Sequence, residues 1–442
     1  MTRGSRPAAG NGSRRNAKGN GRGNGNENGS GKDTVAVVLS GAAARGAFQA
    51  GALAELIPAL ERDGLTPTIW LGTSAGSINA VLWGAAAHRD AATAAEEVLD
   101  VWRHMNDEDV YQRLVSLSST RSVVQFARGA VLGRGPGSTS LLDTTPLRRT
   151  ATDELNTAQL AANIQAGVVS AVGVVATRMP AEPDGAGDRT VAGASSGRSV
   201  LFLDEHAPGG YKGDPQRALD VVRGPLNPDH VLASSAIPVA FPPVRVTQPA
   251  QATGWYIDGG VRLNTPLHPA VGLGATKILL VSATATTYGP PPPPDHTSRT
   301  PDMADAAAQV LHAALADRTT EDLQALRRTN TTAAKMSAIG HPDLLKGSTG
   351  RPYRQIDVMA VSPPPGEMGL RAARAFEHRT GGLGRLTEMD NWLVGKAIRG
   401  AGDAWGRREL LSYLLFDEEY FAAGIELGQQ MARAALATGW ES

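Results

Sequence analysis

Ser74 stands at the centre of a Gly-x-Ser-x-Gly pentapeptide, which reads Gly72-Thr73-Ser74-Ala75-Gly76. A serine hydroxyl becomes an effective nucleophile only when its oxygen is accessible and a nearby base takes its proton. Glycine at positions 72 and 76 lets a strand reverse into a helix without side-chain collisions, so the serine can occupy a strained turn with its oxygen outward. The pentapeptide therefore predicts a nucleophilic serine, and the alternative is a purely structural turn.

The position of this pentapeptide strengthens the prediction. With 51 glycines in 442 residues, chance alone would produce the pattern about 0.3 times in the chain. Here it follows an apolar strand pattern, Thr68-Ile69-Trp70-Leu71, and precedes a helical pattern from Ser77 to about His88. A strand, a tight turn and a helix are the context that a nucleophilic serine of this type requires.

A second glycine-containing loop, Ser40-Gly41-Ala42-Ala43-Ala44-Arg45-Gly46, lies between a strand pattern at residues 34–39 and a helical pattern at residues 47–62. Backbone N–H groups at a helix N-terminus favour anions. The two glycines have the spacing of a P-loop, but Ala47-Phe48 replaces the Lys-Ser/Thr pair that binds nucleotide phosphates. We therefore expect an oxyanion hole instead, with N–H donors from Gly41, Ala42, Ala43 and Ala75.

Arg45 is the one charged residue of this loop. Its guanidinium either steadies the loop, binds a phosphate headgroup or is simply solvated, because an arginine beside a helix N-terminus suits each of these roles. The sequence leaves the three roles open.

Asp258 ends a short strand pattern, Trp255-Tyr256-Ile257, and is followed by Gly259-Gly260. An Asp-Gly pair by itself most often marks only a turn. A carboxylate delivered by a strand into a glycine turn is also suited to accept a proton from a serine hydroxyl. Asp258 is therefore our candidate for the base that partners Ser74.

Taken together, these segments resemble the patatin-like phospholipases. The resemblance rests on four motifs in the same order: Leu39 to Phe48, Gly72 to Gly76, Ala233-Ser234-Ser235-Ala236-Ile237-Pro238-Val239-Ala240-Phe241-Pro242-Pro243, and Asp258-Gly259-Gly260. It covers roughly residues 34–285, and more loosely extends to Leu410–Asp417. It implies an α/β fold of three layers, α/β/α, with a mainly parallel central sheet.

The same resemblance implies the chemistry. Lipid acyl esters, of the phospholipase A or lysophospholipase type, would be cleaved by a Ser-Asp dyad, Ser74 and Asp258, through an acyl-enzyme and without a cofactor or a metal. Asp258 would take the hydroxyl proton and later activate water. The supporting positions in these motifs are Arg45, Gly46, Gly72, Gly76, Gly259 and Gly260.

One departure concerns the oxyanion loop. The family usually has Gly-Gly-Gly where this chain has Gly41-Ala42-Ala43. Alanine keeps the N–H donors but resists the positive φ angles that glycine adopts freely. Either these positions have ordinary dihedral angles or the hole is distorted, and in the second case the protein would be a catalytically impaired lipid-binding homologue.

A Ser-His-Asp hydrolase is a further alternative, because Ser74, Asp258 and His268 occur in the chain order of α/β-hydrolase triads. Replacement of His268 by alanine would distinguish the two mechanisms. On the dyad mechanism turnover changes by less than about tenfold, whereas loss of a triad member costs on the order of 10⁴ or more.

The elements around these motifs predict how they are positioned. A strand, helix, strand and helix open the chain after residue 33, which is typical of a parallel sheet covered by helices. Residues 166–177 and 198–203 form a predicted hairpin with an insert at 182–197, and further strands are expected at 277–281 and 356–361. We expect a disordered basic tail at 1–32, a catalytic core at 33–285, and at 286–442 a polyproline connector, a completing strand and C-terminal helices of the same domain.

Composition excludes several classes of protein. The chain is 41% hydrophobic, has 43 basic and 43 acidic residues, and contains no cysteine. Disulfides, thiolate metal sites and cysteine nucleophiles are therefore excluded, and no charge excess favours nucleic acid. No metal-ligand spacing occurs, and no apolar stretch approaches the ~18 residues of a membrane-spanning helix. We expect a cytoplasmic protein, soluble or peripheral at a membrane.

Three segments are candidates for contact with lipid. They are the basic tail at 1–32, an amphipathic pattern from Trp392 to Arg408, and a cap over the acyl pocket between Met105 and Pro136. A solvated tail, a core-packing helix and a surface excursion explain the same segments. The sequence determines neither which lipid or other ester is the substrate nor the oligomeric state.

Overall fold

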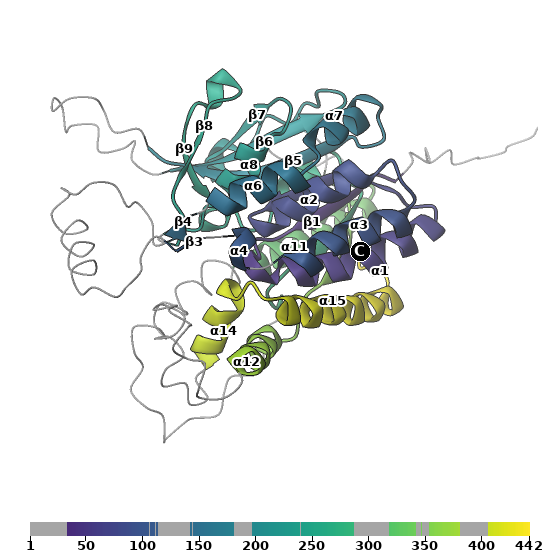
Figure 1. Ribbon diagram of the computed structural model, residues 1–442. Coiled ribbons are helices and arrows are strands. Elements are labelled where there is room, and N and C mark those ends of the chain that lie inside the picture. Colours follow the sequence, from purple (N-terminus) through teal and green to yellow (C-terminus); the bar gives the residue numbers. More distant parts are fainter. Residues whose placement is uncertain are drawn as a thin grey trace, which may run out of the picture. The chain divides into compact units, whose positions relative to one another are not determined.

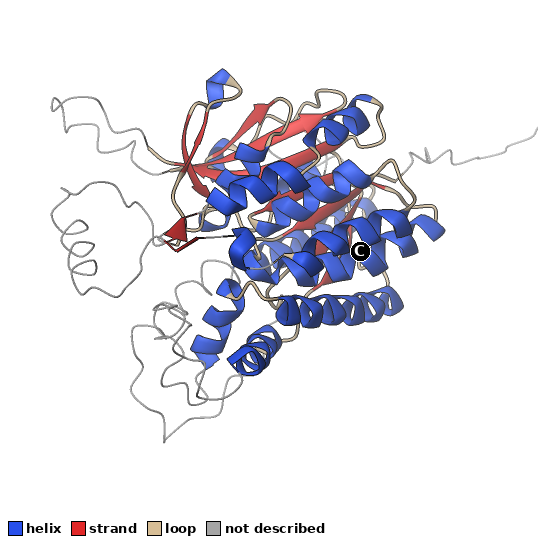
Figure 2. Ribbon diagram, viewed as in Figure 1, coloured by secondary structure: helices blue, strands red, loops and turns tan. Residues whose placement is uncertain are grey.

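The computed structural model of the protein describes most of the chain after residue 32 (Figure 1). The described ranges are 33–105, 107–110, 112–113, 142–143, 145–180, 197–238, 240–286, 318–341, 346, 353–380 and 405–442. Within them, helices alternate with strands over much of the sequence, and the strands gather into a sheet that helices cover (Figure 2).

Among the described residues, nine strands form one mixed sheet. These are β1 Val35–Leu39, β2 Pro67–Thr73, β5 Ala171–Arg178, β6 Arg198–Glu205, β7 Leu219–Arg223, β8 Val244–Val246, β9 Gly254–Asp258, β10 Lys277–Val281 and β11 Asp357–Val361. Their order is β11-β10-β1-β2-β5-β6-β7, with β9 paired to β5 and β8 paired to β9. A separate ribbon joins β3 (Gln112–Arg113) to β4 (Leu142–Asp143).

The strands from β11 to β5 are parallel to one another. Their sequences are short apolar runs because helices cover both faces of a parallel sheet, and all five residues of β1 are buried. Adjacent parallel strands end at the same edge, where open α/β sheets carry their sites. The loops that follow β1 and β2 therefore leave the sheet side by side.

The antiparallel strand β9 reaches this same edge through its pairing with β5. Val175 of β5 pairs with Thr73, the last residue of β2, and the next residue, Ala176, pairs with Asp258 of β9. β9 thus occupies the side of β5 that β2 leaves free when it ends. The residue after Thr73 and the carboxyl end of β9 are thereby brought together.

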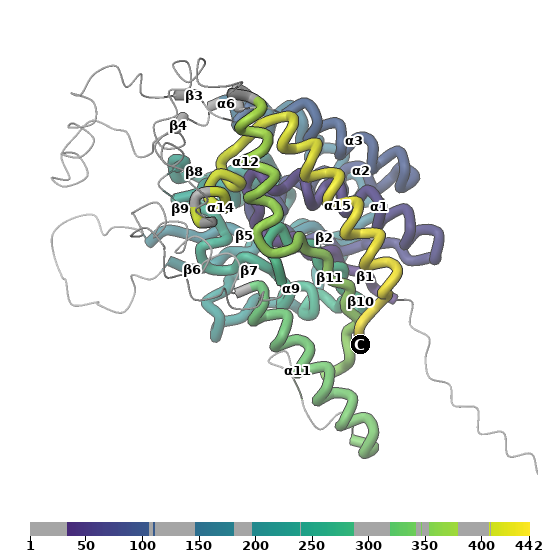
Figure 3. Tube along the Cα trace, turned by 90° about the horizontal axis from the view of Figure 1, so that it is seen from below, coloured from purple at the N-terminus to yellow at the C-terminus, as the bar shows by residue number. Residues whose placement is uncertain are grey.

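Two hydrophobic cores lie on opposite faces of the sheet. One contains buried side chains of α1, α2, α3, α8 and α15, and the other contains those of α9 and α11. Figure 3 shows α9 and α11 on one side of the sheet and α2 and α3 on the other. The helices are η1 Ala43–Arg45, α1 Gly46–Arg62, α2 Ala75–Ala86, α3 Ala91–His104, α4 Asp107–Val110, α6 Thr145–Glu154, α7 Thr157–Gln165, η2 Pro215–Arg217, α8 Pro228–Ser234, η3 Ala250–Ala252, η4 Gly259–Val261, α9 Leu267–Gly272, α11 Arg318–Ala338, α12 Glu367–Thr380, α14 Trp405–Leu414 and α15 Glu418–Thr438.

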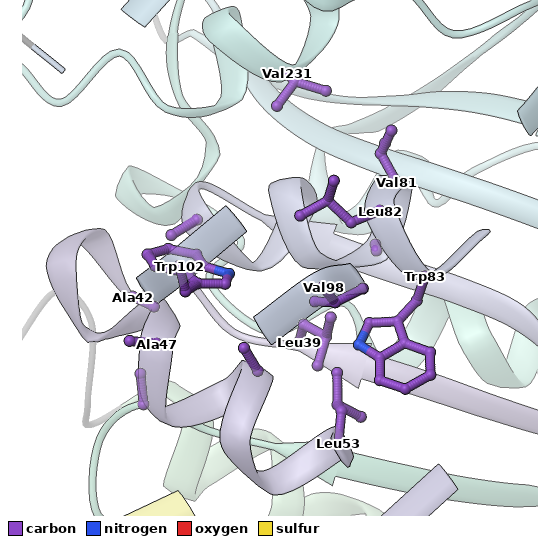
Figure 4. Packing of buried hydrophobic residues seen from close by; sticks show 14 of the residues in the cluster. Leu39, Ala42, Ala47, Leu53, Val81, Leu82, Trp83, Val98, Trp102 and Val231 are labelled. Atoms are coloured by element: carbon purple, nitrogen blue, oxygen red, sulfur yellow. The ribbon is translucent and has the colours of Figure 1, made fainter. Parts of the chain in front are cut away.

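The larger core is closed by a tight crossing of α1 and α15, which lie side by side in Figures 1 and 3. A Cβ atom at Gly428 would stand 2.1 Å from the carbonyl oxygen of Phe48, so glycine is required for this approach. Trp70 of β2 and Trp83 of α2 stack with ring centroids 5.7 Å apart. Figure 4 shows part of this packing, including Leu39, Leu53 and Trp83.

The fold is thus a three-layer α/β/α arrangement around a mainly parallel sheet, as the sequence predicts. The strands expected at 277–281 and 356–361 are β10 and β11, which pair with each other. The sequence analysis did not identify β7 or β8. Residues 1–32, 114–136, 182–196, 289–294 and 392–404, on which further predictions fall, lie outside the described residues.

Candidate active site

Ser74 occupies a strained turn between β2 and α2. Its φ and ψ are 53° and −131°, a left-handed φ that side-chain-bearing residues rarely adopt. The flanking glycines are required by close backbone contacts. A Cβ atom at Gly72 would lie 2.2 Å from the carbonyl oxygen of Gly76, and one at Gly76 would lie 2.5 Å from that of Ser40. The local geometry is that of a serine presented at the end of a strand.

The backbone of Ser74 is held by Ser234 of α8. The Ser74 N–H donates a 2.8 Å hydrogen bond to the Ser234 hydroxyl, which in turn donates to the carbonyl oxygen of Val175. Asn227 and His230 form a capping box that fixes the first turn of α8. Sequence analysis noted Ser234 only within a motif and assigned it no role, since nothing local in the sequence indicates its contact with Ser74.

Asp258 ends β9 at a position where its carboxyl group is buried. Its Oδ1 accepts a 2.6 Å hydrogen bond from the N–H of Gly260, and its own N–H donates to the carbonyl oxygen of Ala236 at 2.9 Å. A Cβ atom at Gly259 would lie 2.2 Å from the carbonyl oxygen of Val175. The Asp-Gly-Gly sequence therefore lets the carboxyl end of β9 approach β5 closely.

The environment of Asp258 makes its carboxyl group more basic than usual. Burial raises the pKa of Asp258 to about 6, and the hydrogen bonds from the Ser74 hydroxyl and the Gly260 N–H offset this rise only in part. A carboxylate with a pKa near neutrality is better matched to proton abstraction than an ordinary aspartate. The Ser74 hydroxyl thus lies close enough to the Asp258 carboxyl group to lower its pKa.

The loop after β1 lies against the serine turn. A Cβ atom at Gly41 would stand 3.5 Å from that of Ser74 and only 2.3 Å from Oδ1 of Asn264, so the loop and Asn264 are in close contact. The Gly41 N–H donates both to this Oδ1, at 3.0 Å, and to the Asn264 carbonyl oxygen, at 3.1 Å. In this conformation the Gly41 N–H is therefore engaged rather than open to an oxyanion.

The two alanines that replace the family's usual glycines behave differently from each other. Ala42 has a φ of −139°, which any residue adopts, whereas Ala43 has a left-handed φ of 47°. Among the described residues, no acceptor is hydrogen-bonded to the N–H of Ala42, Ala43 or Ala75. At Ala43 the loop therefore has a backbone conformation that favours glycine. Within the described part of the chain, the three N–H groups have no hydrogen-bond acceptor.

Arg45 is buried rather than solvated, with 2% of its surface exposed. Its guanidinium pairs with the carboxylate of Glu409 and contacts Ser412 and Tyr413, all on α14. Of the roles considered from the sequence, these contacts agree with a loop-steadying arginine and not with a solvated one. Gly46 follows it, where a Cβ atom would stand 2.2 Å from the Trp102 ring.

His268 does not have the partners that a triad histidine would have, which are Ser74 and Asp258. Its Nε2 is 3.7 Å from a carboxylate oxygen of Asp214, and its Nδ1 is 3.5 Å from the hydroxyl of Tyr211. No histidine within the described ranges is hydrogen-bonded to Ser74 or Asp258. The described geometry offers the triad alternative no support.

An apolar cavity of about 20 Å³ begins beside the serine turn. Ile78, one helical turn after Ser74 on α2, lines it, as does Ser235, the neighbour of the serine that holds the Ser74 N–H. The hydroxyl of Ser235 is buried and has no hydrogen-bond partner among the described residues. The remaining wall residues come from α3, α6 and α8 or directly follow α3 and α6: Val101, Met105, Leu147, Thr150, Ala151, Glu154, Leu155, Val231 and Leu232.

The described residues contain no cluster of three or more His, Asp or Glu side chains placed to hold a metal ion. Among the helices within those ranges, none combines the length and the apolar character needed to cross a bilayer.

No curated protein matches the chain in sequence. Two solved structures resemble it at 12% identity: VipD from Legionella pneumophila, with a TM-score of 0.33, and human GIVD cytosolic phospholipase A2, with a TM-score of 0.36. The matches cover 93% and 92% of this chain, and 68% and 61% of those chains.

A sequence model described as patatin-like phospholipase matches residues 37–271, more than half of the 442-residue chain. The matched range includes the serine turn, the loop after β1, α8 and Asp258. The chain therefore belongs to the patatin-like phospholipase family, and it is a lipid-hydrolysing enzyme.

Proposed function

We propose that the protein cleaves lipid acyl esters of the phospholipase A or lysophospholipase type by a Ser-Asp dyad, with Ser74 as nucleophile and Asp258 as base. One observation carries the proposal. The Ser74 hydroxyl, on a strained turn, lies close enough to a buried carboxyl group to influence its pKa, which burial raises to about 6. Near neutral pH most of this carboxyl group is ionised, so it can accept the proton that activates the serine.

The proposed reaction has two steps. Ser74 Oγ attacks the ester carbonyl carbon while its proton passes to Asp258, and collapse of the tetrahedral intermediate breaks the bond to the leaving alcohol, which takes that proton. Asp258 then removes a proton from water, whose oxygen attacks the acyl-serine. A second collapse releases the fatty acid and returns the proton to Ser74. No histidine takes part in this scheme.

The N–H groups of Ala42, Ala43 and Ala75 are the proposed oxyanion donors, and Gly41 becomes a positioning residue. Support comes from their lack of internal acceptors among the described residues and from the close contact of the loop with the serine turn. Preorganised N–H donors of this kind each contribute about 3 kcal/mol to transition-state stabilisation. The Asn264 side chain, whose Oδ1 accepts from the Gly41 N–H, would then fix the base of the loop.

The apolar cavity beside Ser74 is the proposed entrance for an acyl chain. One of its wall residues, Ile78, lies one helical turn from the nucleophile, and most of the wall residues are aliphatic. At about 20 Å³ it has room for little more than one water molecule, so we expect the walls contributed by α3 and α6 to separate when an acyl chain enters. Such a site would favour esters with an apolar acyl group over small polar esters.

Peripheral contact with a lipid surface is proposed through the exposed surface where β5 ends and β9 begins, which is called the β5 and β9 edge below. Trp255 is 53% exposed and Met179 is 39% exposed, and the N–H of Met179 donates to the carbonyl oxygen of Trp255. Arg245 pairs with Trp255 across β8 and β9 and is exposed as well. An exposed tryptophan beside a cationic side chain is suited to a membrane interface, and this edge ends at Asp258.

We also propose that residues 286–442 form part of the catalytic domain. The parallel pairing of β10 with β11 and the contacts of α14 with Arg45 support this view.

The decisive experiment uses a fluorophosphonate probe and mixed phospholipid vesicles. The wild-type protein should be labelled and should release fatty acid, and both signals should disappear in Ser74→Ala. In His268→Ala, turnover should stay within about tenfold of the wild type. Failure of the folded wild-type protein to label would contradict the dyad and favour a catalytically impaired lipid-binding homologue.

A further inference from the structure

Arg45, in the loop proposed to bind the oxyanion, is held by a helix more than 350 residues later in the chain. Its Nε donates to the Ser412 hydroxyl at 2.9 Å, and its Nη1 donates to the Tyr413 hydroxyl at 3.2 Å. Its Nη2 is paired with the Glu409 carboxylate. The guanidinium also lies over the Tyr413 ring, 3.9 Å from the centroid. Residues 409–413 of α14 thus make most of the contacts to the guanidinium, and the carbonyl oxygen of Ala283 accepts a further hydrogen bond from Nη1 at 3.3 Å.

This buried ion pair is not expected to add much to the stability of the fold. Glu409 and Arg45 are 5% and 2% exposed, so both charges have lost most of their hydration. The desolvation penalty of such a pair is often as large as its attraction, and apolar residues of similar volume are commonly as stable. The planar arginine fork, in contrast, fixes the orientation of whatever it joins. The pair is therefore better explained by its effect on the orientation of the loop than by its effect on stability.

Ala43 is the residue of the loop whose conformation needs support from its surroundings. A left-handed φ costs an alanine about 1–2 kcal/mol, and strain of this size persists only where the surroundings over-determine the conformation. Ala43 begins η1, and the Arg45 N–H closes this turn onto the Ala42 carbonyl oxygen at 3.0 Å. Arg45 therefore links the strained residue to α14 by a single short helical turn.

Helix α14 is itself firmly attached to the core. The Tyr420 hydroxyl of α15 donates to the carbonyl oxygen of Ser412 at 2.9 Å. Asp417 caps the first turn of α15 by accepting from the Glu419 and Tyr420 N–H groups. Helix α15 in turn crosses α1 at backbone contact distance, at Gly428. Helix α14 is therefore attached to the core through α15.

We propose that Glu409 is a positioning residue, which acts through Arg45 to hold Ala43 in the strained conformation that presents the loop's N–H groups to the oxyanion. The catalytic effect rests on the proposed function, but the mechanical link does not. Glu409 touches no reacting atom. Its loss should therefore lower kcat and leave KM nearly unchanged, because ground-state binding of the ester does not use the oxyanion donors.

The test is a double-mutant cycle between Glu409→Gln and Ala43→Gly. In the wild-type background Glu409→Gln should lower kcat about tenfold, with KM changed by less than about twofold. In the Ala43→Gly background the same substitution should cost less than about threefold, because glycine adopts the left-handed φ without support. An equal loss in both backgrounds would overturn the proposal.

Glu367→Gln is the matched control. Glu367 is paired at 3.0 Å with Arg371 on α12, in the same C-terminal helical layer, and among the described residues this pair has no contact with the loop. It should leave kcat unchanged. A kcat loss as large as that of Glu409→Gln would show a general effect of weakening the C-terminal helices and would refute the specific role. If Glu409→Gln folds poorly, Tyr413→Phe removes one contact to Arg45 and should give a smaller kcat loss of the same pattern.

Amide hydrogen exchange separates this proposal from the proposed function. The amides of Gly41, Arg45 and Gly46 are hydrogen-bonded in the loop and should exchange at least about tenfold faster in Glu409→Gln than in Glu367→Gln. If the wild-type protein proved inactive, the proposed function would fail while this exchange difference still tested the link. Unchanged exchange would refute the positioning role whatever the activity.

Discussion

Ala43 and Ser74, in the two loops that meet at the candidate active site, both have a left-handed φ, at 47° and 53°. For residues with a side chain this conformation costs about 1–2 kcal/mol each. In the proposed mechanism, Ala43 supplies an oxyanion donor and Ser74 is the nucleophile. Strain that is concentrated in this way is typical of sites whose geometry matters more than their stability.

The strain at Ala43 predicts that Ala43→Gly is stabilising. Relief of the left-handed φ should outweigh the extra unfolded-state entropy of glycine and raise the free energy of unfolding by up to about 1 kcal/mol. Denaturant unfolding of the two proteins would measure this difference. Ala42→Gly is the control, because Ala42 has an ordinary φ of −139° and glycine there should destabilise by about 0.5–1 kcal/mol. A stability loss in Ala43→Gly would contradict the assigned backbone.

The raised pKa of Asp258 predicts the pH dependence of activity. The base form is required, so kcat/KM should rise with pH through an apparent pKa of about 6 and reach a plateau above it. Asp258→Asn should lower kcat/KM about 10²–10⁴-fold on the plateau above the pKa and should abolish the rise with pH. A pH profile that stays flat between pH 5 and 8 would be inconsistent with Asp258 as the base, and these values bracket the expected pKa of about 6.

The same carboxyl group predicts an opposite effect on stability. Its folded pKa, about 6, lies above the ordinary 3.8, so the folded state binds more protons in this interval and stability falls as pH rises through it. At roughly 1.4 kcal/mol per pKa unit, ionised Asp258 costs the fold about 3 kcal/mol above pH 7. Asp258→Asn should therefore melt higher than the wild type at pH 8, with the gap closing by pH 4, in thermal unfolding scans.

Ser234 and Ser235 are adjacent serines with opposite predicted effects. Ser234→Ala leaves the buried Ser74 N–H without its acceptor, which should cost about 1–3 kcal/mol of stability and lower kcat by loosening the serine turn. Ser235→Ala removes a buried hydroxyl that has no hydrogen-bond partner among the described residues. It should be neutral or slightly stabilising. Thermal unfolding and esterase assays on the pair would decide, and equal losses would refute the bridging role of Ser234.

The sequence predicts the parts of the site that are local in the chain. Gly72, Gly76 and Gly259 follow from turns that no larger residue can make, and the parallel strands follow from short apolar runs. It does not predict contacts made across the fold. Ser234 reaches Ser74 because α8 packs beside β5, and Glu409 reaches Arg45 because α15 crosses α1.

The backbone conformation of the oxyanion loop is also not predicted by the sequence. Alanine at position 43 argues against a positive φ on propensity alone. The structure has a left-handed residue there because the Arg45 contacts to α14 bear on the loop. Tertiary contacts decide such cases, and only a structure describes them.

The apolar cavity predicts a chain-length preference that can be moved in either direction. Ala151→Leu adds volume to the wall from α6, and Leu147→Ala removes volume from the same helix. The first should shift the preferred acyl chain of p-nitrophenyl esters to shorter lengths and the second to longer ones, with each methylene group contributing about 0.8 kcal/mol. Since the substitutions lie on one helix and act oppositely, a shift in the same direction would indicate damage to the fold rather than reshaping of the cavity.

The exposed edge at Trp255 predicts weak, reversible association with phospholipid vesicles. Trp255→Ala removes an exposed aromatic ring that suits the interface, so the fraction of protein that cosediments with vesicles should fall severalfold. Ile339→Ala is the matched control, because Ile339 is 61% exposed on the chain just after α11 and outside the β5 and β9 edge. Hydrolysis of a soluble p-nitrophenyl ester should be unchanged in both variants. Equal cosedimentation of Trp255→Ala and the wild type would exclude this edge as the membrane contact.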